Sequence, residues 1–140
     1  MKVLLTIPPF VNNDYYMPSL GVYILARTLM DSGFKVEVID FSFEIKIGNI
    51  NADENIYSTC VDSILKHRPD VICFSCNCMT ILPAIQMASK IKKKNKLPII
   101  VGGPIATTNP YDIIKYKTID YVVVGEGEYS LPYLIANMGS

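Results

Sequence analysis

The stretch Pro98-Ile99-Ile100-Val101-Gly102-Gly103-Pro104 is apolar as far as Val101 and then meets two glycines. A short β-branched run that stops at glycine is typical of a strand that leaves its sheet through a tight turn. A backbone without Cβ atoms also lets a flat ligand or a phosphate lie directly against that turn. The stretch therefore predicts a strand, and leaves open whether its end is a plain turn or a binding edge.

Similar short apolar runs alternate with helical segments on both sides of this strand. Val71-Ile72-Cys73-Phe74 is apolar throughout, as in a strand that helices cover on both faces. The expected strands are residues 2–7, 34–40, 71–74, 99–101 and 121–124, and the expected helices are residues 18–32, 56–65, 81–91, 110–116 and 129–137. This alternation predicts an α/β fold: a doubly wound, five-stranded parallel sheet in the flavodoxin-like order 2-1-3-4-5.

Composition limits the functions that such a fold could have. The chain has 140 residues, half of them apolar, which suits one domain spanning residues 1–140. Thirteen basic and thirteen acidic residues cancel, so no overall field favours nucleic acid or a membrane surface as partner. No apolar run approaches the roughly 20 residues of a membrane span, and no secretory leader is evident. We expect a cytoplasmic protein with its four cysteines reduced.

Ligands of doubly wound sheets bind where the strands end, so the loops at residues 8–16, 41–52, 75–80, 102–108 and 125–128 are the candidates. The loop after the first strand lacks Gly-x-Gly-x-x-Gly, which argues against dinucleotide binding although Asp40 is placed for a ribose hydroxyl. Ser75 and Cys76 stand where a phospho-receiver needs a carboxylate. No Ser/Thr-rich phosphate loop is present for flavin.

Cys73, Cys76 and Cys78 lie close together in the sequence, as in some metal and redox sites. Cys73-x-x-Cys76 has the spacing of half a zinc site, but no second pair follows and the single histidine, His67, lies on another element. We interpret Cys60 and Cys73 as buried apolar residues, and Cys76 and Cys78 as residues that line a ligand loop.

Several motifs follow one another along nearly the whole chain. They are Pro8-Pro9, Pro18-Ser19-Leu20-Gly21-Val22-Tyr23-Ile24-Leu25-Ala26, Gly33-Phe34-Lys35-Val36-Glu37-Val38-Ile39-Asp40, Pro69-Asp70-Val71-Ile72-Cys73-Phe74-Ser75, Val101-Gly102-Gly103-Pro104, and Ile119-Asp120-Tyr121-Val122-Val123-Val124-Gly125-Glu126-Gly127-Glu128. In their order and spacing these motifs together resemble the N-terminal cobalamin-binding domain of radical S-adenosylmethionine enzymes.

The resemblance implies cobalamin as the cofactor and places it on particular residues. Ser75-Cys76-Asn77 stands where the family has a Ser-x-Leu loop lining the channel for the nucleotide tail, with Asn77 in place of leucine. Gly102 and Gly103 stand where a glycine pair lets the dimethylbenzimidazole tail pass, so we expect a leucine at Gly103 to fill that passage. The expected cofactor-binding residues are Pro9, Tyr15, Ser75, Cys76, Asn77, Thr80, Gly102, Gly103, Pro104, Gly125, Glu126 and Gly127, with no catalytic residue and no metal ligand.

The first loop departs from one branch of the family. Mutase-type cobalamin domains carry Asp-x-His-x-x-Gly there, whose histidine ligates cobalt from below, whereas residues 10–18 contain no histidine. The resemblance then implies base-off cobalamin without a histidine below the cobalt, as suits methyl transfer or electron exchange at the upper face. Asn12, Asn13, Tyr15 and Tyr16 are candidates for covering the lower face, and a purely structural role for each stays open.

The family's cluster motif, Cys-x-x-x-Cys-x-x-Cys, is not formed by cysteines 60, 73, 76 and 78. The resemblance implies that this chain alone does not cleave S-adenosylmethionine. We expect a domain excised from a longer methyltransferase or Fe-S oxidoreductase, whose following radical S-adenosylmethionine domain would carry the 4Fe-4S cluster and be its partner. The alternatives are a stand-alone, non-catalytic corrinoid or small-ligand module, and an interaction domain.

Overall fold

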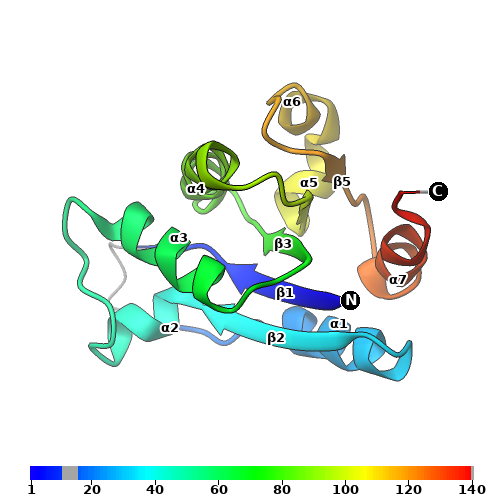
Figure 1. The fold of residues 1–140 in the computed structure, drawn as a ribbon, viewed down its shortest axis with the longest axis horizontal. Coiled ribbons are helices and arrows are strands. Elements are labelled where there is room, and N and C mark those ends of the chain that lie inside the picture. Colours follow the sequence, from blue (N-terminus) through cyan, green and yellow to red (C-terminus); the bar gives the residue numbers. More distant parts are fainter. Residues whose placement is uncertain (11–15, 140) are drawn as a thin grey trace.

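The computed structural model describes residues 1–10 and 16–139 (Figure 1). Its sheet consists of β1 (Lys2–Ile7), β2 (Lys35–Asp40), β3 (Val71–Ser75), β4 (Ile99–Gly102) and β5 (Tyr121–Val122). The order is β2-β1-β3-β4-β5, and every neighbouring pair is parallel. The predicted fold class and strand order are confirmed.

Helices cover both faces of the sheet, as Figure 1 shows. The helices are α1 (Leu20–Asp31), α2 (Phe41–Lys46), α3 (Ile56–Lys66), α4 (Ile81–Lys94), α5 (Pro104–Thr108), α6 (Pro110–Ile114) and α7 (Gly127–Asn137). Helices α1 and α7 pack on one face, and α3 and α4 pack on the other. Within the described residues, no helix has the length and apolar character needed to cross a membrane.

Each face of the sheet has its own buried core because side chains alternate along a strand. Leu4 and Ile72 belong to the core beneath α3 and α4. Leu5, Cys73 and Ile100 belong to the core beneath α1 and α7. The second core is the one that the functional site adjoins.

Two short helices occupy segments that the sequence predicted as loops. Helix α2 begins directly after β2 because the Asp40 carboxylate accepts a hydrogen bond from the Phe43 N–H at 3.1 Å and so caps the helix. Helix α5 begins at Pro104, whose missing N–H costs nothing in a first turn. The sequence predicted five helices, and the described residues form seven because α2 and α5 are added.

The buried sides of two helices also differ from expectation. Helical spacing along α1 predicts that Leu20, Ile24 and Leu25 are buried, yet Leu20 is 72% and Ile24 46% exposed. The buried side chains are those of Val22, Ala26 and Leu29. The same spacing along α4 predicts that Leu82 faces inward, but Leu82 is 65% exposed. Both helices carry apolar residues around much of their circumference, so spacing alone did not determine which side meets the sheet.

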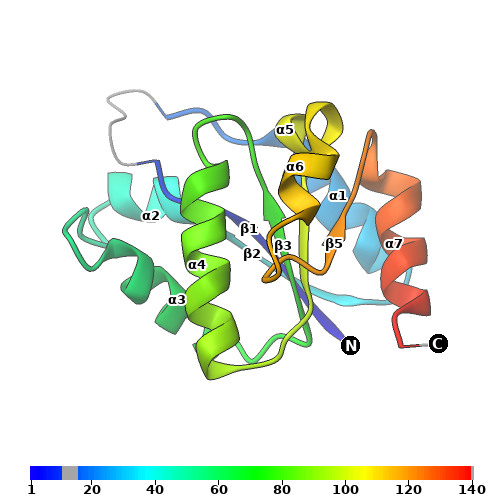
Figure 2. The same cartoon turned by 90° about the horizontal axis from the view of Figure 1, so that it is seen from above.

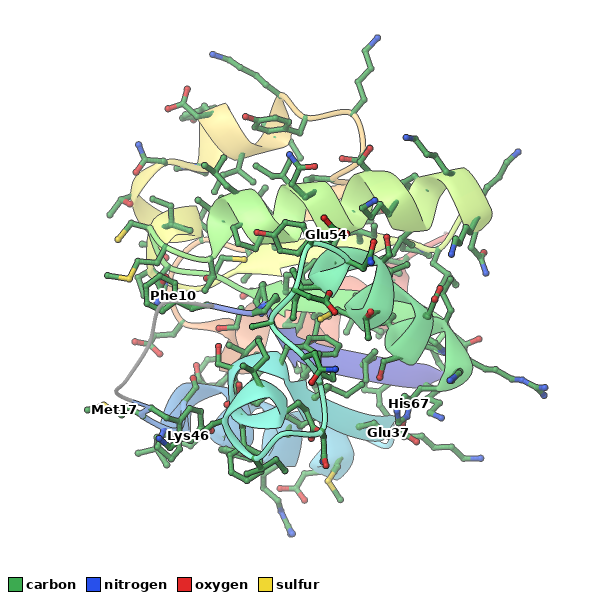
Figure 3. All side chains as sticks on the ribbon, turned by 90° about the vertical axis from the view of Figure 1, so that its left-hand side faces the viewer. Phe10, Met17, Glu37, Lys46, Glu54 and His67 are labelled. Atoms are coloured by element: carbon green, nitrogen blue, oxygen red, sulfur yellow. The ribbon has the colours of Figure 1, made fainter. Side chains whose placement is uncertain are left out.

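The two ends of the sheet are chemically different. Figure 2 shows the N-terminus at one end of the strands and the segments that follow β1, β3 and β4 at the other. In Figure 3, Glu37 and His67 lie together at one end, whereas Phe10 and Met17 lie at the opposite end. The Lys2 ammonium bonds both the Glu37 carboxylate (2.8 Å) and the His67 carbonyl (2.5 Å), which ties three segments together at the amino end.

Candidate functional site

A cavity of about 600 Å³ penetrates the core between the sheet and the helices α1 and α7. Strand register defines its floor, because Leu5 pairs with Cys73 and Cys73 with Ile100, so that three side chains form a row across β1, β3 and β4. One row nearer the carboxyl ends, Ser75 pairs with Gly102. We call this cavity the slot. Its lining includes Val22, Leu25, Thr107, Thr108, Val123, Gly125, Glu126, Gly127, Glu128 and Leu131.

The two glycines at the slot have different surroundings. A Cβ on Gly102 would meet only the Val123 side chain, at 3.9 Å, which is an ordinary contact. Gly103 has φ +100°, and a Cβ there would lie 2.8 Å from the Cys76 amide nitrogen and closer still to the Cys76 carbonyl oxygen. A side chain at Gly103 would therefore collide with the loop after β3 rather than simply fill the passage. Gly102 is the residue whose missing side chain leaves the slot open.

A second cavity of about 460 Å³ adjoins the slot at the carboxyl edge of the sheet. We call it the rim cavity. It shares Ser19, Ser75 and Pro104 with the slot. Its other lining residues are Ile7, Phe10, Tyr16, Met17, Asp40, Ser42, Cys76, Asn77, Met79 and Thr80. A ligand that occupied both cavities would lie on the strand ends and extend down into the core.

The loop after β3 is held by its own side chains. The Asn77 side-chain oxygen accepts hydrogen bonds from the N–H groups of Met79 (2.9 Å) and Thr80 (3.1 Å). In return the Thr80 hydroxyl accepts one from the Asn77 N–H at 3.0 Å. Asn77 thus shapes the turn that leads into α4, a structural reason for a polar residue at this position.

Sequence reasoning missed a polar cluster at the other side of the rim cavity. The Tyr16 hydroxyl donates a 2.5 Å hydrogen bond to the carboxylate of Asp40, a residue only 7% exposed, and the Tyr16 ring lies 5.4 Å from that of Phe43. The Ser42 hydroxyl accepts a bond from the Phe10 N–H at 3.1 Å. Burial, reinforced by Asp40, raises the pKa of the Tyr16 phenol, which stays protonated as a donor. An aspartate at a strand end, before helical residues, was the available signal.

Electrostatics at the slot come from helix ends and carboxylates. Ser19 and Gly21 at the start of α1, and Gly125 to Glu128 at the start of α7, bring two positive helix ends to its opening. Glu126 and Glu128 bring full negative charges to the same place. Among the described residues that line either cavity there is no lysine, arginine or histidine.

The cysteines form no metal site in the described part of the chain, where no three His, Cys, Asp or Glu side chains gather suitably for an ion. All four are free thiols, with Cys60, Cys73 and Cys76 buried and Cys78 exposed. Burial raises the pKa of Cys60, Cys73 and Cys76 to about 12. The prediction that Cys60 and Cys73 are buried is confirmed, and Cys76 lines the rim cavity.

The structure brings most of the predicted site residues to these two cavities. Gly102, Gly103, Gly125, Glu126 and Gly127 line the slot, Cys76, Asn77 and Thr80 line the rim cavity, and Ser75 and Pro104 line both. Pro9 is buried and lines neither cavity. Tyr15, like Asn12 and Asn13, lies outside the described residues.

Comparison with known proteins gives consistent results. The family model for the B12 binding domain matches residues 10–135. The chain is 28% identical over 124 residues to the anaerobic magnesium-protoporphyrin IX monomethyl ester cyclase of Synechocystis sp., covering 86% of this chain and 23% of that protein. It is 27% identical over 124 residues to the hopanoid C-3 methylase of Methylococcus capsulatus, covering 85% and 22%. It thus spans less than a quarter of the length of these relatives.

Solved structures show the same fold. The radical S-adenosylmethionine methyltransferase TsrM from Kitasatospora setae, with cobalamin and a [4Fe-4S] cluster bound, superposes with a TM-score of 0.75 at 24% identity, over 96% of this chain and 26% of that one. The cobalamin-dependent S-adenosylmethionine radical enzyme OxsB superposes with a TM-score of 0.66 at 21% identity, over 96% and 18%. The expected resemblance is confirmed. Because the family model covers nearly the whole chain, this protein belongs to the family of B12 binding domains, whose ligand is cobalamin.

Proposed function

We propose that this chain binds cobalamin in the base-off form, with the corrin ring on the rim cavity and the nucleotide tail in the slot. The observation that carries the proposal is the junction of the two cavities at Ser75 and Pro104, beside a glycine that adds no side chain. A broad recess at the strand ends suits a macrocycle, and a deep apolar recess beside it suits a planar base. The residues proposed to contact cobalamin are Ser75, Cys76, Asn77, Thr80, Gly102, Gly103, Pro104, Gly125, Glu126 and Gly127.

The lower face of cobalt would receive no histidine from this chain. His67 is its single histidine, and its Nδ1 is bonded to the Glu37 carboxylate at the amino end of the sheet, opposite the two cavities. Tyr16, fixed by Asp40, lines the rim cavity and is the described residue that we place nearest the lower face. A bound cobalamin without a protein imidazole would be suited to methyl transfer or electron exchange at its upper face.

We further propose that the domain works within a larger enzyme of the radical S-adenosylmethionine class. Two solved structures that share its fold are of such enzymes, and one of them holds both cobalamin and a [4Fe-4S] cluster. The S-adenosylmethionine site and the cluster would belong to a further domain of the same protein, which would be the partner of residues 1–140. A stand-alone corrinoid carrier is the alternative, and it would have the same two cavities.

Binding is tested by mixing the purified chain with hydroxocobalamin, desalting it and recording the spectrum. We expect corrin absorbance to be retained, and the paramagnetic resonance spectrum of the reduced cob(II)alamin form to lack nitrogen splitting. His67→Ala is the matched control, which should change neither result because His67 lies at the other end of the sheet. Loss of all corrin absorbance on desalting would refute the function, and nitrogen splitting would refute the base-off form without histidine.

A further inference from the structure

We infer that the slot selects among cobamides by the base of the nucleotide tail, accepting a benzimidazole or phenol and discriminating against adenine. This inference rests on the function proposed above, in which the tail occupies the slot. It follows from the distribution of polar atoms along the depth of the slot.

The floor of the slot offers almost no hydrogen-bonding group. Its row consists of Leu5, Cys73 and Ile100, which are 3%, 5% and 1% exposed. The Cys73 thiol is the only polar side-chain group in that row, and a thiol is a weak donor and a weak acceptor. The backbone groups of this row are engaged by strand pairing on both sides of β3. A base that reached the floor would meet an apolar surface.

The buried walls of the slot are also apolar. Val22 of α1, Val123 after β5 and Leu131 of α7 are 3%, 8% and 3% exposed, and all three line the slot as members of the surrounding core. They come from three separate elements, so the apolar lining encloses the floor rather than covering one side.

The polar groups of the slot lie nearer its opening, and one of them is already engaged. The Thr107 hydroxyl accepts a hydrogen bond from the Gly125 N–H at 2.9 Å and lies 3.3 Å from the Gly103 carbonyl, to which it donates. Ser75 is one row closer to the carboxyl edge than Cys73. A polar base held deep in the slot would therefore lie beyond these groups.

Tail bases differ in the polar atoms that they would bury. Dimethylbenzimidazole presents a fused ring with two methyl groups, and a phenol presents a benzene ring. Adenine presents ring nitrogens on its six-membered ring and an exocyclic amine, which lose their water partners on burial. A buried polar group without a partner costs enough to lower affinity by about tenfold or more. A site that lacks partners for such groups discriminates by this mechanism.

The test compares three corrinoids by equilibrium dialysis against the purified chain: cobalamin, the adenine-tailed cobamide, and cobinamide, which has no nucleotide tail. We expect cobalamin to bind more tightly than cobinamide does. Its affinity should exceed that of the adenine-tailed cobamide by about tenfold or more. Dimethylbenzimidazole is harder to detach from cobalt than adenine is. The detachment step by itself would therefore favour the adenine-tailed cobamide, which is the opposite of the expected preference. A phenol-tailed cobamide should bind at least as tightly as cobalamin.

The other outcomes separate the inference from the proposed function. Equal affinity for cobalamin and the adenine-tailed cobamide, both tighter than cobinamide, would overturn base selection while leaving the tail in the slot. Equal affinity for cobalamin and cobinamide would overturn the tail slot and leave corrin binding intact. Binding of none of these corrinoids would overturn both the inference and the proposed function.

A matched pair of variants tests whether the floor of the slot causes the preference for one tail base over another. Cys73→Ser places a stronger hydrogen-bonding group on the slot floor, so the preference for cobalamin over the adenine-tailed cobamide should fall severalfold. Cys60→Ser makes the same change at an equally buried thiol in the core on the other face of the sheet, and the preference should stay as in the wild type. If folded Cys73→Ser keeps the wild-type preference for cobalamin over the adenine-tailed cobamide, the floor of the slot is not the source of that preference. If that variant fails to fold, the three-corrinoid comparison on the wild type decides.

Discussion

The Cα of Gly103 lies against the backbone of Cys76, so close that a Cβ at Gly103 would be 2.8 Å from the Cys76 amide nitrogen. The same two segments are joined by hydrogen bonds, since the Cys76 N–H donates to the Gly102 carbonyl at 2.9 Å and the Ile105 N–H reaches the Cys76 carbonyl at 3.4 Å. The loops after β3 and β4 therefore fit together without strain only when residue 103 is glycine.

The two glycines should respond differently to substitution. Gly103→Ala forces a Cβ against backbone at a positive φ, so we expect the free energy of unfolding to fall by about 1–3 kcal/mol. Gly102→Val adds bulk toward Val123 and into the slot, so it should fold and bind cobinamide while losing affinity for cobalamin. Thermal unfolding and equilibrium dialysis of both variants check this. Equal loss of both corrinoids in Gly102→Val would contradict the assignment of the slot to the tail.

Tyr16 should act through its hydrogen bond to Asp40. Tyr16→Phe removes the donor to a carboxylate that is 7% exposed, so the free energy of unfolding should fall by about 1 kcal/mol. Cobalamin affinity should fall as well, because both residues line the rim cavity. Tyr111→Phe is the control, since Tyr111 is 81% exposed on α6, lines neither cavity and should leave both quantities unchanged. A destabilised Tyr16→Phe with wild-type affinity would limit Tyr16 to a structural role.

Stability at acid pH should depend on Glu37. Its hydrogen bond from Lys2, with that from His67, holds the pKa of the Glu37 carboxyl below its ordinary value. Because the folded-state pKa is the lower one, the stabilisation is present above the unfolded value, near 4.3, and is lost as the pH falls through the folded value.

Glu37→Gln should therefore be less stable than the wild type at pH 7, and the difference should disappear toward pH 3. Urea unfolding at a series of pH values measures this. Glu54→Gln, at an exposed position, is the control that should match the wild type throughout. A difference between Glu37→Gln and the wild type that is the same at pH 7 and pH 3 would show that the carboxylate charge is not its source.

The thiols should differ sharply in reactivity. Burial raises the pKa of Cys60, Cys73 and Cys76 to about 12, so these three remain protonated and enclosed at neutral pH, whereas Cys78 is exposed. Brief iodoacetamide treatment followed by mass spectrometry should find label on Cys78 alone, and on all four after denaturation. Rapid labelling of Cys76 in the native chain would show that the rim cavity opens farther than the structure indicates.

Local patterns in the sequence were sufficient for the architecture. The β-branched runs that end at Gly102 and after Phe74 indicate strands whatever their neighbours are. Gly33, with φ +92°, is the glycine that typically follows the end of a helix such as α1. The short helices α2 and α5 were missed because six and five residues carry too little periodicity to detect. Their start signals, Asp40 and Pro104, were present but also fit loops.

The sequence by itself determined a parallel α/β sheet, a ligand edge at its carboxyl end and a glycine pair on that edge, because these depend on residues adjacent in the chain. Only the tertiary structure decided that Leu5, Cys73 and Ile100 share one row, that Tyr16 meets Asp40, and that a side chain at residue 103 would collide with Cys76 whereas one at residue 102 would not. These relationships join segments far apart in the sequence, and strand register and helix rotation, which set them, are fixed by the packing of the whole domain.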